Sequence, residues 1–297
     1  MNEGLQDVVV QFSPESLSLL NIFLAIIMFG IALNMDASGF KEIVRNPKAV
    51  AVGVISQFLL LPFLTFLLVL ILKPLPGLAL GMFLVSACPG GNISNFFTLQ
   101  SHGNTALSVS LTGVSTLLAP FLTPLNFGLW ASLYEPTRPI IRMFEVSFWD
   151  LAETVLLILI LPLIFGLIFK QKFPSITERI ARPIKVISIL ILAGFIGVAL
   201  LKNLDVFQGY FRFVLGLVFI HNLLALVLGF ILGILLLDLR DAKTLSIETG
   251  IQNSGLGLII IFNFFDGSGP MALVAAWWGV WHIIAGFAAS WLYRKLK

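Results

Sequence analysis

The sequence predicts an all-α membrane protein that forms one integral unit over residues 1–297. Three observations support this fold class. The chain is 58% hydrophobic and only 11% charged, its apolar residues are gathered in long segments, and the stretches between these segments are short. A soluble core built from a chain of this length could not bury so much apolar surface.

Nine segments reach the roughly 20 apolar residues that a helix needs to cross a bilayer. They cover residues 17–35, 48–71, 78–101, 104–132, 148–169, 184–202, 208–236, 242–265 and 269–293. The two longest connections, residues 135–139 and 170–185, carry the proline and charge that are typical of connecting stretches. We therefore expect nine transmembrane helices and no separate soluble domain.

Polar features mark the second, third and fourth segments. Gln57 is an amide in the second segment, where it is either structural or a ligand. The third segment is interrupted by CPGGNISN, residues 88–95, and a break inside a bilayer must face other protein or a wet cavity. In the fourth segment, Ser108 and Thr112 are spaced i, i+4 and share one helix face. They either ease helix packing or bind a ligand.

The later segments repeat part of this arrangement. The sixth segment carries GVAL (197–200) where the first carries GIAL (30–33), and two segments later the eighth is interrupted by ETGIQNSG (248–255). The GFILG of the seventh (229–233) is typical of close helix contact. We therefore expect segments 1–4 and 6–9 to form two repeats, and we expect these repeats to be inverted because only the fifth segment separates them. Paired interruptions of this kind indicate a transporter's binding site at the membrane midplane.

The basic residues orient the chain. If the N-terminus lies outside, thirteen of the 18 Lys and Arg residues fall on the cytoplasmic side, which is the bias that the positive-inside rule describes. We expect a multi-pass protein of the cell inner (plasma) membrane, with its N-terminus outside and its C-terminus in the cytoplasm. The basic residues lie in short loops rather than on one face, which argues against a nucleic-acid partner.

Glu248 is the only carboxylate deep inside an expected span. An ionised acid in hydrocarbon is strongly disfavoured unless it is paired or binds a cation, and no Lys or Arg lies in the same helix core. Neutral oxygens surround it in the sequence, on Thr249, Gln252, Asn253 and Ser254. Oxygens of this kind suit a hard cation rather than a soft metal. The alternative is an acid at a helix end, held by backbone N–H groups.

No enzyme motif accompanies these residues. The chain contains no GxSxG, HExxH or P-loop pattern and no paired catalytic acids. We therefore expect a protein that is not an enzyme, and a membrane-embedded lipid-modifying enzyme is a remote alternative. We also expect a monomer.

Four stretches of the chain resemble the bile acid:sodium symporter family: CPGGNISN, GNTALSVSLTGVSTLLAP (103–120), IETGIQNSGL (247–256) and VWH (280–282). The resemblance runs over nearly the whole chain. It implies two crossing discontinuous helices, the third and the eighth, in a core domain of about residues 48–132 and 208–268. It also implies a panel domain of about residues 17–35 and 148–202.

The resemblance further implies sodium-coupled symport of an organic anion, bile-acid-like or a small carboxylate, by alternating access with two Na⁺ ions. Carried over to this sequence, the first sodium site would be Ser94, Asn95, Ser108, Thr112 and Glu248. The second would be Gln57, Glu248 and Gln252 with the backbone carbonyls of Thr249 and Ile251. The substrate residues would be Asn92, Ile93 and Asn253.

Sodium/proton antiport is the rival function, because crossed broken helices occur in such proteins too. That exchange needs a titrating acid with a second acid or base nearby. The neighbours of Glu248 in the sequence are amides and hydroxyls instead.

Overall fold

The computed structural model describes residues 14–34, 44–144, 147–202 and 204–296. Five helices in these ranges are long and apolar enough to cross a membrane, namely Pro47–Leu72, Thr105–Leu133, Phe148–Lys172, Phe213–Leu236 and Gly269–Arg294. They support the expected all-α membrane fold. Met35 at the end of the first expected span lies outside the described residues, as do the basic residues Lys41 and Lys297.

The elements follow one another with short connections. In chain order they are α2 (Pro14–Asn34), α4 (Pro47–Ile55), η2 (Ser56–Leu60), α5 (Leu61–Leu72), α6 (Pro76–Ala87), α7 (Ser94–Gln100), α8 (Thr105–Leu133), η3 (Glu135–Thr137), α9 (Arg138–Met143), α10 (Phe148–Val155), η4 (Leu156–Ile160), α11 (Leu161–Lys172), α12 (Pro174–Lys202), α13 (Leu204–Leu236), α14 (Leu239–Gly250), α15 (Ser254–Phe264) and α16 (Gly269–Arg294).

Two helices are interrupted where the sequence predicts breaks. The first break separates α6 from α7, and the second separates α14 from α15. The two unwound stretches lie against each other, because the Gly91 N–H donates to the Ile251 carbonyl at 2.7 Å and the Asn253 N–H donates to the Pro89 carbonyl at 2.8 Å. Each break therefore satisfies backbone groups that the other leaves free, as an apolar environment requires.

A π-helical turn precedes a proline in each of two long helices. The turn η2 joins α4 to α5 just before Pro62, and η4 joins α10 to α11 just before Pro162. Proline has no N–H to donate and its ring crowds the preceding turn, so the wider π turn lets the helix continue. The turn η2 contains Gln57, whose side chain reaches the second break.

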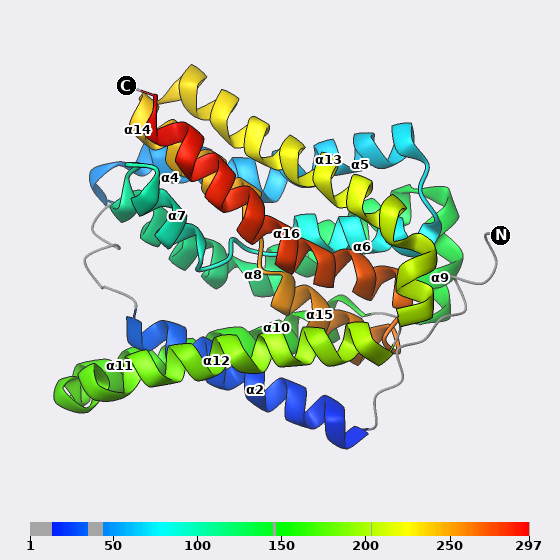
Figure 1. The fold of residues 1–297 in the computed structure, drawn as a ribbon, viewed down its shortest axis with the longest axis horizontal. Helices are drawn as coiled ribbons and strands as arrows, with labels where there is room; N and C mark the ends of the chain where they lie inside the picture. Colours follow the sequence, from blue (N-terminus) through cyan, green and yellow to red (C-terminus); the bar gives the residue numbers. More distant parts are fainter. Residues whose placement is uncertain (1–13, 35–43, 145–146, 203, 297) are drawn as a thin grey trace.

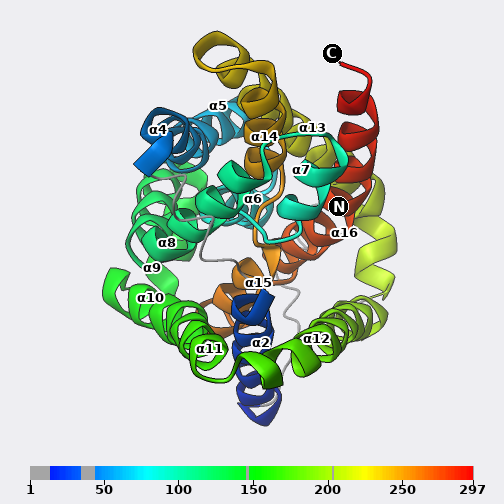
Figure 2. The same ribbon diagram turned by 90° about the vertical axis from the view of Figure 1, so that its left-hand side faces the viewer.

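The half-helices α6, α7 and α14 lie on one side of the molecule, α2, α11 and α12 lie together on another, and α15 lies between them against α2 (Figure 1, Figure 2). Among the helices, α2 packs against α11 and α12, α13 packs against α14, and α16 packs against α6. A Cβ built on Gly229 of α13 would lie 2.4 Å from the backbone oxygen of Leu245 in α14. The expected close helix contact at residues 229–233 is therefore confirmed.

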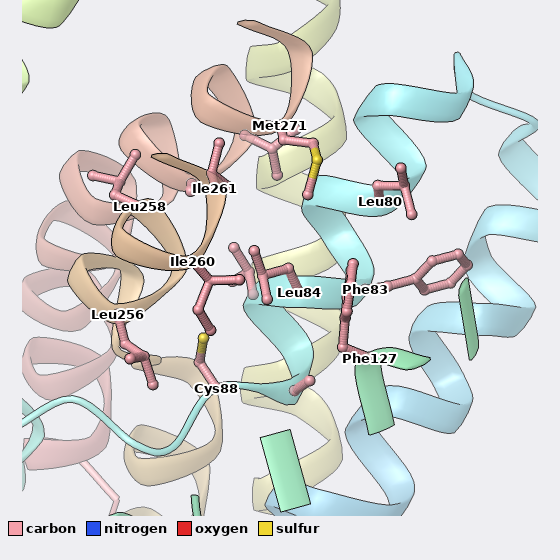
Figure 3. Close-up of a cluster of buried hydrophobic side chains, with 14 of the residues drawn as sticks. Leu80, Phe83, Leu84, Cys88, Phe127, Leu256, Leu258, Ile260, Ile261 and Met271 are labelled. Carbon is pink, nitrogen blue, oxygen red and sulfur yellow. The ribbon is translucent and has the colours of Figure 1, made fainter. Parts of the chain in front are cut away.

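The main apolar core lies on the α6 and α15 side of the breaks. Leu84 of α6 points toward Ile260 of α15, whereas Phe83 points to the other side of α6, where its ring contacts those of Phe66 and Tyr134 (Figure 3). Cys88, the cap of α6, is buried in the same cluster, with its sulfur toward α15. This core anchors two half-helices and leaves the polar side of the breaks to α7, α8 and α14.

The two long connections are themselves largely helical. Residues 135–139 form η3 and the start of α9, and residues 170–185 are helical apart from Phe173. Pro174 stands at the start of α12, where a helix needs no N–H donor and the fixed φ of proline is favourable. The proline therefore begins a helix here instead of marking a loop.

Candidate functional site

Glu248 stands in the last turns of α14, just before the second break, and is 1% exposed. Three hydroxyls donate to its carboxylate. Ser94 Oγ lies 2.5 Å from Oε1, Thr112 Oγ1 lies 3.3 Å from Oε1 and 3.2 Å from Oε2, and Ser108 Oγ also bonds Oε1. The carboxylate is thus held by side-chain hydroxyls rather than by the backbone N–H groups of the alternative interpretation.

Local structure explains why these hydroxyls meet. Ser108 and Thr112 are one turn apart on α8, as their spacing predicts, and Ser94 is the first residue of α7 after the Gly-Gly turn. Asn95 joins them, because its Oδ1 accepts the Ser108 hydroxyl at 2.8 Å. The structure brings together all five side chains of the first implied sodium site. Sodium binding by them stays a prediction.

A second group of oxygens lies around the end of α14. Gln57 Nε2 donates to the Glu248 carbonyl at 3.1 Å, and Gln252 Nε2 donates to the Thr249 carbonyl at 2.8 Å. The side-chain oxygens of both glutamines are buried and have no hydrogen-bond partner among the described residues. The Ile251 carbonyl already accepts a backbone N–H from the first break. The implied ligands of the second site are therefore neighbours, although the backbone carbonyls of residues 248 to 251 all accept hydrogen bonds.

The site is rich in acceptors and short of positive charge. Within the described part of the chain, no cationic side chain pairs with Glu248. The single Ser108 hydroxyl proton faces two acceptors, Glu248 Oε1 and Asn95 Oδ1. A buried carboxylate without a counter-charge is strongly disfavoured. Such a cluster of hard oxygen atoms can bind a hard cation.

The implied substrate residues border the breaks. Asn253 caps α15, because its Oδ1 accepts the Leu256 N–H at 3.1 Å. Asn92 and Ile93 are half-buried in the turn before α7, and Ile93 packs against a small apolar cluster that includes Phe97. The Asn253 amide nitrogen has no hydrogen-bond partner among the residues described, and it is free to donate to a ligand.

Two polar residues at the second break were not predicted from the sequence. Asn222 of α13 is buried, and its Nδ2 donates to the Gly250 carbonyl, the last of α14, at 2.6 Å. Ser56 shares a hydrogen bond of 2.8 Å with the hydroxyl of Thr249. Two sequence features could have pointed to them. Asn222 is an amide inside the apolar run VFIHNLLALVLGF, and Ser56 is next to Gln57. Both residues hold the end of α14 in place.

Known proteins match this chain over most of its length. A sequence model of the Sodium Bile acid symporter family matches residues 21–210. YocS of Bacillus subtilis (strain 168), named an uncharacterized sodium-dependent transporter, is 35% identical over 283 residues, which cover 94% of this chain and 84% of that protein. The probable sodium/metabolite cotransporter BASS2, chloroplastic, of Oryza sativa subsp. japonica is 32% identical over 83% of this chain and 57% of its own length.

A human protein is also similar. The sodium-dependent organic anion transporter of Homo sapiens is 26% identical over 93% of this chain and 72% of its own length. The chain thus spans most of the bacterial and human relatives and just over half of the rice protein. These relatives are named as transporters, and none is named as an enzyme. With a family match that covers more than half of its residues, this chain belongs to the sodium bile acid symporter family.

Proposed function

We propose that this protein is a secondary active transporter that couples inward sodium movement to the uptake of an organic anion. The observation that carries the proposal is the buried Glu248 carboxylate, which meets three hydroxyls and, among the described residues, no cationic side chain. The names of the relatives, which include a sodium-dependent organic anion transporter, support sodium as the coupling ion.

Two sodium ions per cycle are proposed because two groups of oxygens share Glu248. One ion would lie among the hydroxyls and the Asn95 oxygen, and would relieve the competition for the Ser108 proton. The other would satisfy the unpaired oxygens of Gln57 and Gln252. Because both ions draw on one carboxylate, their binding should be cooperative.

The proposed architecture has nine membrane crossings, with helices 1–4 and 6–9 as inverted repeats and the N-terminus outside. The core domain would comprise about residues 48–132 and 208–268, and the panel domain about residues 17–35 and 148–202. The packing of α2 against α11 and α12 supports this division, with α15 of the core in contact with α2 (Figure 2). Movement of the core against the panel would expose the site to one side of the membrane and then to the other.

Uptake should be electrogenic and should release no protons. With two Na⁺ per monoanion, one net positive charge moves inward. A tenfold sodium gradient contributes about 1.4 kcal/mol per ion, and a potential of about 100 mV contributes about 2.3 kcal/mol. In proteoliposomes, an inside-negative potassium diffusion potential should accelerate sodium-dependent uptake. Uptake that ignores the potential would contradict this stoichiometry, and proton release when sodium is added without substrate would favour antiport.

The proposed substrate is an organic anion, bile-acid-like or a small carboxylate, bound near Asn92, Ile93 and Asn253. The start of α15 offers N–H groups and the positive end of a helix dipole, and Asn253 adds an amide N–H₂ that has no hydrogen-bond partner among the described residues. A thermal-shift screen of carboxylates with and without sodium would identify the ligand, since a bound ligand raises the melting temperature.

Asn253→Asp should impair substrate binding more than sodium binding. Aspartate caps a helix as well as asparagine does, so α15 should keep its start, but a carboxylate would replace the amide that faces the anion. We expect about a tenfold or greater loss of substrate affinity, with a smaller loss for Asn253→Ser, which is uncharged. The sodium-induced rise in melting temperature should persist in both variants. Equal losses for both ligands would place Asn253 among the ion ligands instead.

A further inference from the structure

A second buried carboxylate, Asp241, lies two helical turns before Glu248 in α14 and is 5% exposed. Its Oδ1 accepts the side-chain amide of Asn104 at 2.9 Å, and its Oδ2 accepts that of Asn46 at 3.1 Å. Asn104 directly precedes α8 and Asn46 directly precedes α4. One carboxylate therefore joins the starts of three helices, α4, α8 and α14, which pack against one another (Figure 2).

Both asparagines are themselves helix caps. Asn46 Oδ1 accepts the Ala49 N–H at 3.3 Å, and Asn104 Oδ1 accepts the Leu107 N–H at 3.1 Å. Each asparagine uses its oxygen for its own helix and its nitrogen for Asp241. The N-terminal end of a helix carries partial positive charge, so a carboxylate among three such ends is also stabilised electrostatically.

The same three helices, with η2 continuing α4, also lead to residues around Glu248, which Ser94 of α7 joins. On α14, Asp241 and Glu248 are seven residues apart and share one face. On α8, Asn104 and Ser108 are one turn apart and bond these two carboxylates in turn. In η2, which continues α4, Gln57 reaches the Glu248 carbonyl. Because the three helices start together and run in the same direction, their common starting point sets which residues meet at Glu248.

We propose that Asp241 is a positioning residue for sodium. The clamp formed by Asn46, Asp241 and Asn104 holds α4, α8 and α14 in the register that aligns the ion ligands before an ion arrives. This inference rests on the proposed function of Glu248 as a sodium ligand. Without the clamp, sodium binding must also align the helices, so sodium affinity falls while the filled site works as before.

Asp241→Asn tests the clamp. The side-chain oxygen introduced at position 241 can accept a hydrogen bond from one of the two asparagines. Its N–H₂ group would face the N–H₂ group of the other asparagine, and two donors cannot pair, so one hydrogen bond is lost. We expect the sodium concentration for half-maximal thermal shift and half-maximal uptake to rise about tenfold. The maximal rate at saturating sodium should stay near the wild-type rate. An unchanged sodium dependence in this variant overturns the proposal.

Combining Asp241→Asn with Asn46→Asp exchanges the two groups and should restore function. The carboxylate introduced at position 46 still caps α4 and can accept from the new amide at position 241, whose oxygen still accepts from Asn104. The double variant should recover the wild-type sodium dependence, and no recovery overturns the proposal. Asp238→Asn is the matched control, because it preserves the cap of α14, where Asp238 Oδ1 accepts the Asp241 N–H at 2.8 Å. It should bind sodium as the wild type does.

Asn104→Ser keeps the proposal testable if Asp241→Asn does not fold. Serine preserves the cap of α8 and removes only the amide that reaches Asp241. This variant should also need more sodium, and a wild-type sodium dependence overturns the proposal. Glu248→Gln separates the two proposals. If that variant shows the wild-type thermal shift and uptake in response to sodium, the proposed ion site is wrong. If Glu248→Gln shows no response to sodium while Asp241→Asn has the wild-type sodium dependence, the ion site stands and only the proposed clamp is wrong.

Discussion

Glu248→Gln should abolish sodium-dependent uptake and the sodium-induced rise in melting temperature. The substitution keeps the side-chain volume and one oxygen but removes the counter-charge that both proposed ions share. A charge pair separated by about 4 Å is worth about 4 kcal/mol at an effective dielectric constant of about 20. Sodium affinity should therefore fall about a hundredfold or more. Thermal-shift titrations with sodium and uptake into proteoliposomes measure both effects.

The Glu248→Gln protein should still fold. The hydroxyls of Ser94, Ser108 and Thr112 can each donate or accept, so they can turn to pair with an amide. Removal of a buried charge that has no counter-charge also relieves its desolvation penalty. Glu153→Gln is the matched control, at an exposed glutamate of α10, and should behave as the wild type. A monodisperse Glu248→Gln protein with cooperative, sodium-dependent uptake would show that the shared carboxylate is not the mechanism.

Gly229→Ala should lower the melting temperature of the protein by forcing α13 away from α14. The added Cβ would lie 2.4 Å from the Leu245 backbone oxygen and 2.8 Å from the Ser246 Cα, and backbone atoms cannot turn aside. Overpacking of this kind costs about 1–3 kcal/mol or more. The shift would also strain the bond from the Ser246 hydroxyl to the Leu226 carbonyl, 2.7 Å long, and so loosen the helix that carries Glu248. Sodium affinity should fall together with stability.

Gly216→Ala is the control for this effect, because it lies in the same helix and no described atom comes within 4 Å of its added Cβ. Alanine forms helices better than glycine does, so this variant should melt at the wild-type temperature or above it. Melting followed by fluorescence in detergent compares the two variants directly. A Gly229→Ala protein as stable as the Gly216→Ala protein would contradict the close α13–α14 contact.

The breaks and the cluster around Glu248 could be predicted because their signals are local. Proline followed by two glycines inside an apolar run cannot continue a helix, so residues 89–91 mark a break. The i, i+4 spacing of Ser108 and Thr112 places both hydroxyls on one face of α8, and both are found on the Glu248 carboxylate.

Contacts between distant helices could not be predicted in this way. Asn104 and Asp241 are separated by 137 positions, and nothing near either residue indicates that they pair. Proline and charge mark connections in most sequences, but Pro174 occupies the first turn of a helix, where proline is favourable, and the stretch that contains it is helical. Pairings of this kind depend on how the helices pack, which hydropathy alone does not specify.

Equilibrium binding of radioactive sodium to the purified protein shows whether Glu248 binds the ions, because the measurement needs neither a substrate nor a membrane. Wild-type protein and Glu248→Gln are measured side by side over a range of sodium concentrations. We expect saturable, cooperative binding of two ions per wild-type chain and no binding above background for the variant. A single ion per wild-type chain, or equal binding by the two proteins, would contradict this expectation.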